Sequence, residues 1–194
     1  MKKLIFLAIA IMALLLNTNA QSTQFGVKAG VNFAKLTGDI ENAKTRTSFH
    51  AGGVMEFMFS DKFSLQPELL YSSQGTEQDY NGATITSKMD YLNLPLKGKF
   101  YVAEGFSLQA GPQVGYLIAA EQETDSDVVP VEDDLRSLRQ DFDFGAIFGI
   151  GYKLSSGLFF DASYNVGLYN INNAGYYDIQ YKNNVIQVSL GYLF

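Results

Sequence analysis

The amino-acid sequence predicts an all-β fold: an eight-stranded antiparallel transmembrane up-and-down β-barrel, preceded by a cleaved signal peptide. Three observations predict it. Apolar and polar residues alternate with the period of a β-strand in eight segments of about ten residues each. The connections between these segments alternate between long and short, as they do in bacterial membrane barrels. The chain also begins with the parts of an export signal.

The first 20 residues have the organisation of a secretory signal peptide. Two lysines precede an uncharged apolar run of 13 residues, and Thr18 and Ala20 form a small-x-small cleavage site. A membrane-spanning helix needs about 20 apolar residues, so a retained anchor is disfavoured. We expect cleavage after Ala20, which leaves a barrel domain over residues 21–194; an uncleaved leader is the alternative.

Each predicted strand places apolar side chains on one face and glycine or polar side chains on the other. In the first strand, for example, Phe25 and Val27 alternate with Gly26 and Lys28. The eight predicted strands are residues 24–36, 49–59, 63–72, 91–100, 106–116, 141–152, 160–168 and 186–194. Three of them contain an internal proline, which removes a ladder donor, and we therefore expect local bulges at Pro67, Pro95 and Pro112.

The connections predict the orientation of the barrel. Four are long and polar, at about residues 37–48, 73–88, 119–140 and 169–183, and three are short turns near residues 60–62, 103–105 and 155–157. Bacterial barrels have an even number of strands, short periplasmic turns and long outer loops. We therefore expect both termini in the periplasm and the four long connections outside.

The apolar face is rich in Phe, Tyr and Leu and is assigned to the lipid; the polar face is assigned to the lumen. A set of charged residues shares the lumen-facing phase: Lys28, Glu56, Glu68, Lys97, Lys99, Asp141, Asp143 and Asp161. Charges in a low-dielectric interior must be paired, so we expect an internal network of salt bridges and hydrogen bonds. The alternative is a polar conduit for small ions.

The last strand ends the chain on an apolar row in a single phase, formed by Val188, Leu190, Tyr192 and Phe194. A terminal aromatic residue that closes such a strand is typical of the assembly signal of outer-membrane barrels. We therefore expect the barrel-assembly machinery to be a partner of this chain, with outer-membrane lipids and lipopolysaccharide as its surroundings.

Composition excludes several classes of protein. The chain has no cysteine, so it forms no disulfides and carries no lipid-modified cysteine. Its formal charge of −6 argues against nucleic-acid binding, which needs a basic face. No nucleotide-binding or metalloprotease motif is present, and we expect no cofactor.

The longest connection carries clustered carboxylates, of which Glu121, Glu123, Asp125 and Asp127 are the candidate metal ligands. They could bind calcium or bridge to lipopolysaccharide through divalent cations. Their spacing does not match an EF-hand, so a solvated acidic loop without metal is favoured. Within the same connection, acidic residues precede basic ones over residues 131–140, which suits a short helix.

An enzymatic alternative rests on His50, the only histidine, and on Ser48, which lies on the same face of the same predicted strand. A serine nucleophile needs its base within hydrogen-bonding distance and a third group to orient that base. Two residues along one strand are about 6.6 Å apart, which is too far. Catalysis is therefore disfavoured, and His50 is expected to be a polar residue at the outer end of a strand.

Several segments resemble the outer-membrane β-barrel domain family, whose members are often labelled porin-like or PorT-like: residues 63–71, 91–96, 110–116 and 143–145. The resemblance spans about residues 24–194 and implies an eight-stranded barrel without a settled activity. The leading hypothesis is a non-enzymatic outer-membrane barrel of structural, interaction or small-solute role with a packed, largely closed lumen. The alternatives are a component of a secretion or gliding complex and, less favoured, a membrane-embedded enzyme acting on lipid.

Overall fold

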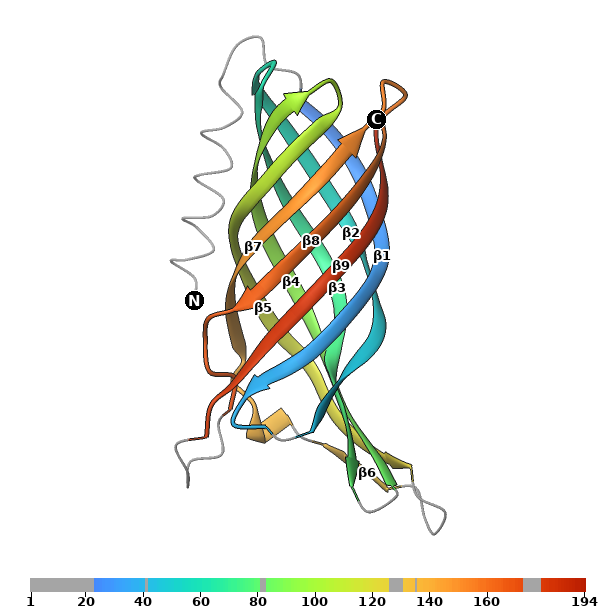
Figure 1. Ribbon diagram of the computed structural model, residues 1–194, viewed down its shortest axis with the longest axis vertical. Coiled ribbons are helices and arrows are strands. Elements are labelled where there is room, and N and C mark those ends of the chain that lie inside the picture. The colour runs from blue at the N-terminus through green and yellow to red at the C-terminus, as the bar shows by residue number, and fades with distance from the viewer. Residues whose placement is uncertain (1–22, 41, 81–82, 126–130, 135, 173–178) are drawn as a thin grey trace.

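The computed structural model describes residues 23–40, 42–80, 83–125, 131–134, 136–172 and 179–194. The predicted signal peptide therefore lies outside the described residues. Nine strands form one sheet, and eight of them close into a ring in the order β1–β2–β3–β4–β5–β7–β8–β9, with β9 pairing back to β1 (Figure 1). All pairs are antiparallel, which confirms the predicted up-and-down barrel of eight strands. The strands are β1 (Thr23–Gly38), β2 (Ala43–Ser60), β3 (Phe63–Tyr80), β4 (Ala83–Ala103), β5 (Phe106–Asp125), β6 (Val131–Asp134), β7 (Phe142–Lys153), β8 (Leu158–Gly167) and β9 (Tyr181–Leu193).

The predicted two faces are present in the barrel. Large apolar side chains such as Phe25, Leu94 and Phe148 are more than half exposed on the outside, whereas Lys28 and Lys97 are buried inside. A closed ring leaves no free sheet edge, which a spanning structure requires because lipid cannot hydrogen-bond the backbone. The terminal row also faces outwards along β9. Its last residue is fixed to the first strand, because the Phe194 amide donates to the Phe25 carbonyl at 2.7 Å.

The strands are longer than predicted. Residues 73–88 were expected to form a loop, but β3 and β4 stay paired from Ser73↔Asp90 to Tyr80↔Ala83. β2 and β5 extend in the same direction, so that the sheet continues beyond the closed barrel, at the lower end of Figure 1. We call this part, residues 43–45, 76–80, 83–88 and 121–125 together with β6, the ribbon, and the two ends of the barrel the ribbon end and the turn end. The ribbon lies beyond the lipid-facing part of the barrel, and its strands lack the apolar alternation that reveals strands in a sequence.

The expected bulges at Pro67, Pro95 and Pro112 are absent, and this prediction was wrong. The pairing register is constant on both sides of Pro67 and of Pro112. The irregularities lie elsewhere. Where β2 pairs with β3 they fall between Thr45 and His50 and between Met58 and Ser60. Where β4 pairs with β5 they fall between Asp90 and Tyr91 and between Tyr101 and Ala103. Proline has a fixed φ close to that of an extended strand. Each of these prolines therefore removes a ladder hydrogen bond without adding a residue to its strand.

The prediction of a helix over residues 131–140 is also largely wrong. Its first part is β6, which pairs with Glu121–Thr124 of β5, and only the 3-10 turn η1 (Arg136–Leu138) is helical. Without β6, the edge of β5 beyond the barrel would have no pairing strand. Its backbone hydrogen-bonding groups favour the addition of a strand, whereas a short helix is only marginally stable. Asp141 and Gln140 then attach the segment to the barrel rim through backbone bonds to Leu117 and Ile171. Among the described residues, no helix is long and apolar enough to span a membrane.

Candidate functional site: the barrel lumen

Four charged side chains fill the middle of the lumen, and we call them the central cluster. Lys28 from β1 and Lys97 from β4 contact the two oxygens of the Glu68 carboxylate from β3, at 2.6 and 3.2 Å. Asp161 from β8 lies 3.0 Å from Lys97 and 4.0 Å from Lys28. The two positive and two negative groups balance each other. Their side chains are at most 1% exposed, so these charges do not contact bulk water. The cluster connects strands on different sides of the lumen.

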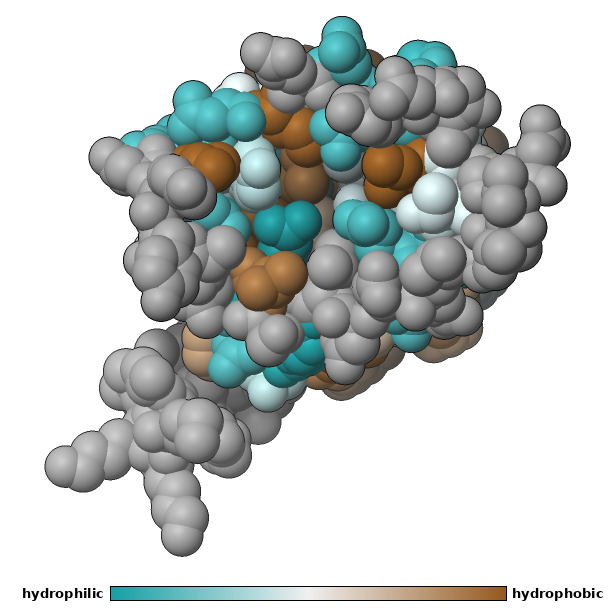
Figure 2. All heavy atoms as spheres, turned by 90° about the horizontal axis from the view of Figure 1, so that it is seen from below, coloured by the Kyte–Doolittle hydropathy of each residue, from teal (hydrophilic) through white to brown (hydrophobic). Residues whose placement is uncertain are grey.

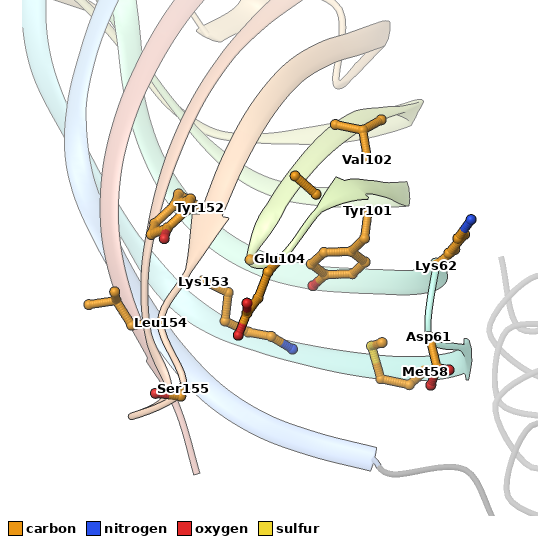
Figure 3. A pocket seen from close by; sticks show the side chains of 12 residues that line it. Met58, Asp61, Lys62, Tyr101, Val102, Glu104, Tyr152, Lys153, Leu154 and Ser155 are labelled. Atoms are coloured by element: carbon orange, nitrogen blue, oxygen red, sulfur yellow. The ribbon is translucent and has the colours of Figure 1, made fainter.

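A second group of charges, the turn-end cluster, lies closer to the short turns. Glu56 pairs with Lys99 at 3.3 Å and with Lys153 at 2.9 Å, and it accepts hydrogen bonds from the hydroxyls of Ser64 and Tyr101, both at 2.6 Å. Figure 3 shows Tyr101 and Lys153 extending into the space between the turns at this end, where a cavity of about 630 Å³ opens. The Glu56 carboxylate is thus held by four side chains, of which Tyr101 and Lys153 also line this cavity.

Gln66 connects the two clusters. It accepts a hydrogen bond from Lys99 at 2.9 Å and donates one to Glu68 at 2.7 Å. Six of the eight charges expected in the lumen are thus brought into one continuous network: Lys28, Glu56, Glu68, Lys97, Lys99 and Asp161. Sequence reasoning missed Lys153 and Tyr101. Tyr101 has the same phase as Lys99, and Lys153 has the same phase as Gly151, so strand phase was a usable signal for both.

The other two expected lumen charges differ from this network. Asp143 is buried on the lumen side, but no described cation forms an ion pair with it. Asp141 is not a lumen residue, and that prediction is corrected: its side chain is 59% exposed and pairs with Arg136 at 2.9 Å. The ladder between β5 and β7 ends at Tyr116↔Phe142, so the alternation that directs Asp143 inwards no longer applies to Asp141.

His50 lies inside the lumen and not at the end of a strand as expected. Its Nδ1 is 2.8 Å from Asn32 Oδ1 and its Nε2 is 2.8 Å from Ser189 Oγ. An amide oxygen only accepts, so Nδ1 carries the proton and Ser189 donates to Nε2. Ser48 has a different partner, the Ser73 carbonyl at 2.6 Å. The structure therefore gives His50 a serine and an orienting amide, but neither comes from its own strand.

Two buried clusters of apolar side chains lie towards the two ends of the barrel. At the ribbon end they form a buried cluster of Leu36, Met89, Tyr91, Leu117, Ala120 and Ile171. Seen from that end in Figure 2, apolar groups lie between hydrophilic ones within the rim. Towards the turn end, Val54, Phe159 and Leu193 form a second cluster, and the Lys99 ammonium lies 5.8 Å from the centre of the Phe159 ring. Sequence reasoning missed both clusters because it treated the lumen face as polar throughout.

Glycines on the lumen face make room for neighbouring side chains. A Cβ on Gly151 would overlap the amide of Gln109, and one on Gly145 would overlap the side chain of Asn165. The Gln109 and Asn165 side chains each extend over β7 at a glycine, where β7 has no side chain of its own. Gly145 and Gly151 of β7 therefore make room for these neighbouring side chains.

The acidic connection does not form a compact metal site in the part that is described. Glu121 is exposed on β5, and Glu123 forms an ion pair with Lys88 across the ribbon. The side chain of Asp125 and all of Asp127 lie outside the described residues. Among the residues that the structure describes, no group of three or more histidine, cysteine or acidic side chains is placed to hold a metal ion.

Comparison with known proteins shows which of them share this architecture. The model of a domain described as the outer membrane protein beta-barrel domain matches residues 19–173. Neisserial surface protein A, a solved structure, has 12% sequence identity and a TM-score of 0.60, with 89% of this chain and 99% of that chain covered. The comparison with curated proteins gives no match.

A second solved structure is Ail, the attachment invasion locus protein of Yersinia pestis, in complex with the heparin analogue sucrose octasulfate. It has 15% identity and a TM-score of 0.52, and the alignment covers 89% of this chain and 99% of that chain. At this level of identity the two structures demonstrate a shared fold. They support an eight-stranded barrel and assign no role to any residue of the lumen.

Proposed function

This chain belongs to the outer membrane protein beta-barrel domain family, and from this premise we propose that it is a non-conducting outer-membrane barrel whose lumen is closed by its own side chains. One observation carries the proposal: the central cluster is fully buried, one buried apolar cluster lies towards the ribbon end, and a second lies beside the turn-end cluster. An eight-stranded barrel encloses only enough space for side chains, so each of these layers is sufficient to narrow the lumen.

Liposome swelling tests whether small solutes pass. Vesicles that contain the full chain, placed in an isosmotic solution of a small sugar or amino acid, are expected to swell no faster than protein-free vesicles. A large porin reconstituted in parallel provides the positive control. Swelling that is faster with the chain than without it, and that slows as the solute becomes larger, would rule out a closed lumen.

We also propose that both termini and the short turns face the periplasm, so that the ribbon projects from the cell. The support is the pairing of β1 with β9 and the contrast between the three short turns and the extended ribbon. The chain has no cysteine, so single cysteines can report orientation. A membrane-impermeant maleimide added to intact cells should label Asp79→Cys in the ribbon and spare Ser155→Cys in a turn. The reverse pattern would contradict the orientation.

The ribbon is the part best placed for interaction with other molecules. Its residues 43–45, 76–80, 83–88, 121–125 and 131–134 include eight acidic and two basic residues. The Ail structure was solved with a sulfated polyanion, whereas an acidic surface repels such a ligand and favours a cationic partner. In nanodiscs the chain should bind to immobilised polylysine and not to heparin. The Glu77→Gln/Glu121→Gln variant should bind polylysine more weakly, and Asp61→Asn/Glu104→Gln at the turn end should not.

An enzymatic role is the second candidate, because Ser189, His50 and Asn32 are connected as nucleophile, base and orienting group. Burial opposes it: His50 is 1% exposed and Ser189 is 4% exposed, so no substrate reaches the hydroxyl. A fluorophosphonate probe, which labels activated serines, is expected to leave the chain unmodified. Labelling that Ser189→Ala abolishes would establish the enzymatic reading.

The third candidate is a component of a secretion or gliding complex. It requires stable protein partners, whereas a lone barrel requires none. Purification of the chain from its native membrane in mild detergent should yield the barrel without stoichiometric partners. Recovery of the same partners in constant ratio would favour the complex over a lone barrel.

A further inference from the structure

The connection between β5 and β7 carries its acidic residues and its basic residues in separate segments. It begins with the acidic residues of the ribbon, and its only basic residues, Arg136 and Arg139, come just before β7. Backbone bonds fix this second part to the barrel: the Leu117 amide donates to Asp141 at 2.8 Å, and the Gln140 amide donates to Ile171 at 2.9 Å. The two arginines are thus held on the rim of the barrel while the carboxylates extend away from it.

Beneath Arg136 lies a row of outward-facing aromatic rings at the end of the apolar belt. Tyr116, Phe142, Phe144 and Tyr169 are in sequential contact, with ring centres 5.4 to 6.4 Å apart. The Arg136 guanidinium lies 5.6 Å from the centre of the Tyr116 ring. Aromatic rings concentrate where the hydrocarbon of a membrane meets its headgroups, so Arg136 lies at headgroup level.

A cavity of about 470 Å³ opens between the arginines and the rings, lined by Arg136, Arg139, Gln140, Asp141, Phe142, Phe144 and Tyr169. Arg136 donates to the Leu117 carbonyl and to Asp141. Arg139 lies 5.3 Å from the centre of the Tyr181 ring, and its buried Nε has no acceptor among the described residues. A buried donor of a charged group without an acceptor is costly. The guanidinium that carries this Nε also lines the cavity, so a second positive charge faces the same space as Arg136.

We propose that this rim pocket binds the phosphate of an outer-leaflet lipid. The proposal rests on the orientation given above, which places the ribbon end in the outer leaflet. Guanidinium groups bind phosphate with two parallel hydrogen bonds, and the apolar row below them offers a surface for the acyl chains of the same molecule. Free phosphate would use the arginines alone, so the combination of charge and aromatic rings favours the lipid.

Native mass spectrometry of the full chain in detergent micelles tests the pocket, with bisphosphorylated lipid A as the probe. The wild type should retain this lipid and release the dephosphorylated form. Arg136→Gln/Arg139→Gln should weaken binding by about tenfold or more. Lys44→Gln/Lys88→Gln, which removes two positive charges of the ribbon outside the pocket, should leave binding unchanged. Heat-modifiable migration on a gel verifies that each variant is folded.

Asp141→Asn gives a second arm, because it removes the carboxylate that competes with phosphate for Arg136 and should therefore strengthen binding. Weaker binding by Asp141→Asn, or equal losses in the two double variants, would overturn the proposal. Displacement of the lipid by inorganic phosphate at the same concentration would also overturn it, since the pocket would then recognise free phosphate. Binding in micelles does not depend on whether the lumen is closed or on how the barrel is oriented in the membrane. The lipid-binding proposal can therefore fail while the closed lumen and the orientation hold, and the reverse is also true.

Discussion

At the scale of single residues, the lumen depends most on Glu68. Both of its carboxylate oxygens contact an ammonium group, Lys28 at 2.6 Å and Lys97 at 3.2 Å, and Gln66 adds a hydrogen bond at 2.7 Å. A buried charge is tolerated only while its partners remain. Removal of Glu68 would leave two ammonium groups to share Asp161.

Glu68→Ala is therefore expected to lower the free energy of unfolding by about 3–5 kcal/mol, the usual loss when one partner of a buried ion pair is removed. Lys44→Ala, which breaks the exposed pair with Asp79, should change it by about 1 kcal/mol or less. Urea titration in phospholipid vesicles, followed by gel migration, measures both. A Glu68→Ala protein as stable as Lys44→Ala would contradict the role given to the central cluster.

Adjacent glycines in β2 provide a second test at this scale. A Cβ on Gly52 would overlap the Leu69 carbonyl oxygen of the neighbouring strand, whereas one on Gly53 would meet nothing within 4 Å. Gly52→Ala should reduce refolding yield and stability because backbone atoms must shift, and Gly53→Ala should behave like the wild type. The same urea titration measures the difference. Equal behaviour of the two variants would show that the strand spacing at Gly52 is not constrained.

At the scale of elements, the barrel strands were predictable from sequence because lipid on one side and a polar lumen on the other enforce alternation, as at Lys28 between Val27 and Ala29. The ribbon was not, because it lies beyond the lipid-facing part of the barrel and the segment from Thr76 to Tyr80 has no apolar alternation. The partners of His50 were also out of reach, since Asn32 and Ser189 are 18 and 139 residues away in the chain. Such contacts follow from strand register, which no local pattern encodes.

The ribbon is expected to be dispensable for folding. Removal of residues 77–80 and 83–86 would leave Thr76 and Ser87, which are paired, joined by Asn81-Gly82, a sequence favoured in two-residue hairpins. This shortened chain should still insert and show heat-modifiable migration. Deleting the paired residues 69–70 and 93–94 within the barrel should prevent folding, because β2 and β5 then lose register. Failure of the ribbon deletion to fold would show that the ribbon supports the barrel.

The last strand leads to a prediction that separates assembly from stability. Phe194 is 69% exposed, and its ring contacts that of Tyr192 at 5.8 Å. If the row Val188, Leu190, Tyr192 and Phe194 is an assembly signal, Phe194→Ala should lower the amount of protein in the outer membrane of cells. Refolding of the purified variant into micelles should remain normal. Phe148→Ala, which removes an equally outward ring from β7, should affect neither; equal losses in cells would dismiss the signal.

At the scale of the whole molecule, the lumen is filled in layers from one end to the other. The turn-end cluster, the central cluster and the hydrogen-bonded group around His50 follow one another, and apolar side chains pack towards both ends. Opening a path would require several buried ion pairs to separate together. In the proposed function the barrel is therefore a sealed support, and the proposed contacts with other molecules involve the ribbon and the rim.

Single-channel recording in planar bilayers tests this central claim most directly. The full chain, reconstituted in high salt and held at voltages of either sign, is expected to give a stable baseline without conductance steps, because the charge network and both apolar clusters stay in place. Insertion is verified by recovering heat-modifiable protein from the same preparation. Reproducible steps of uniform size from the wild-type chain would contradict the closed lumen and favour a conduit for ions.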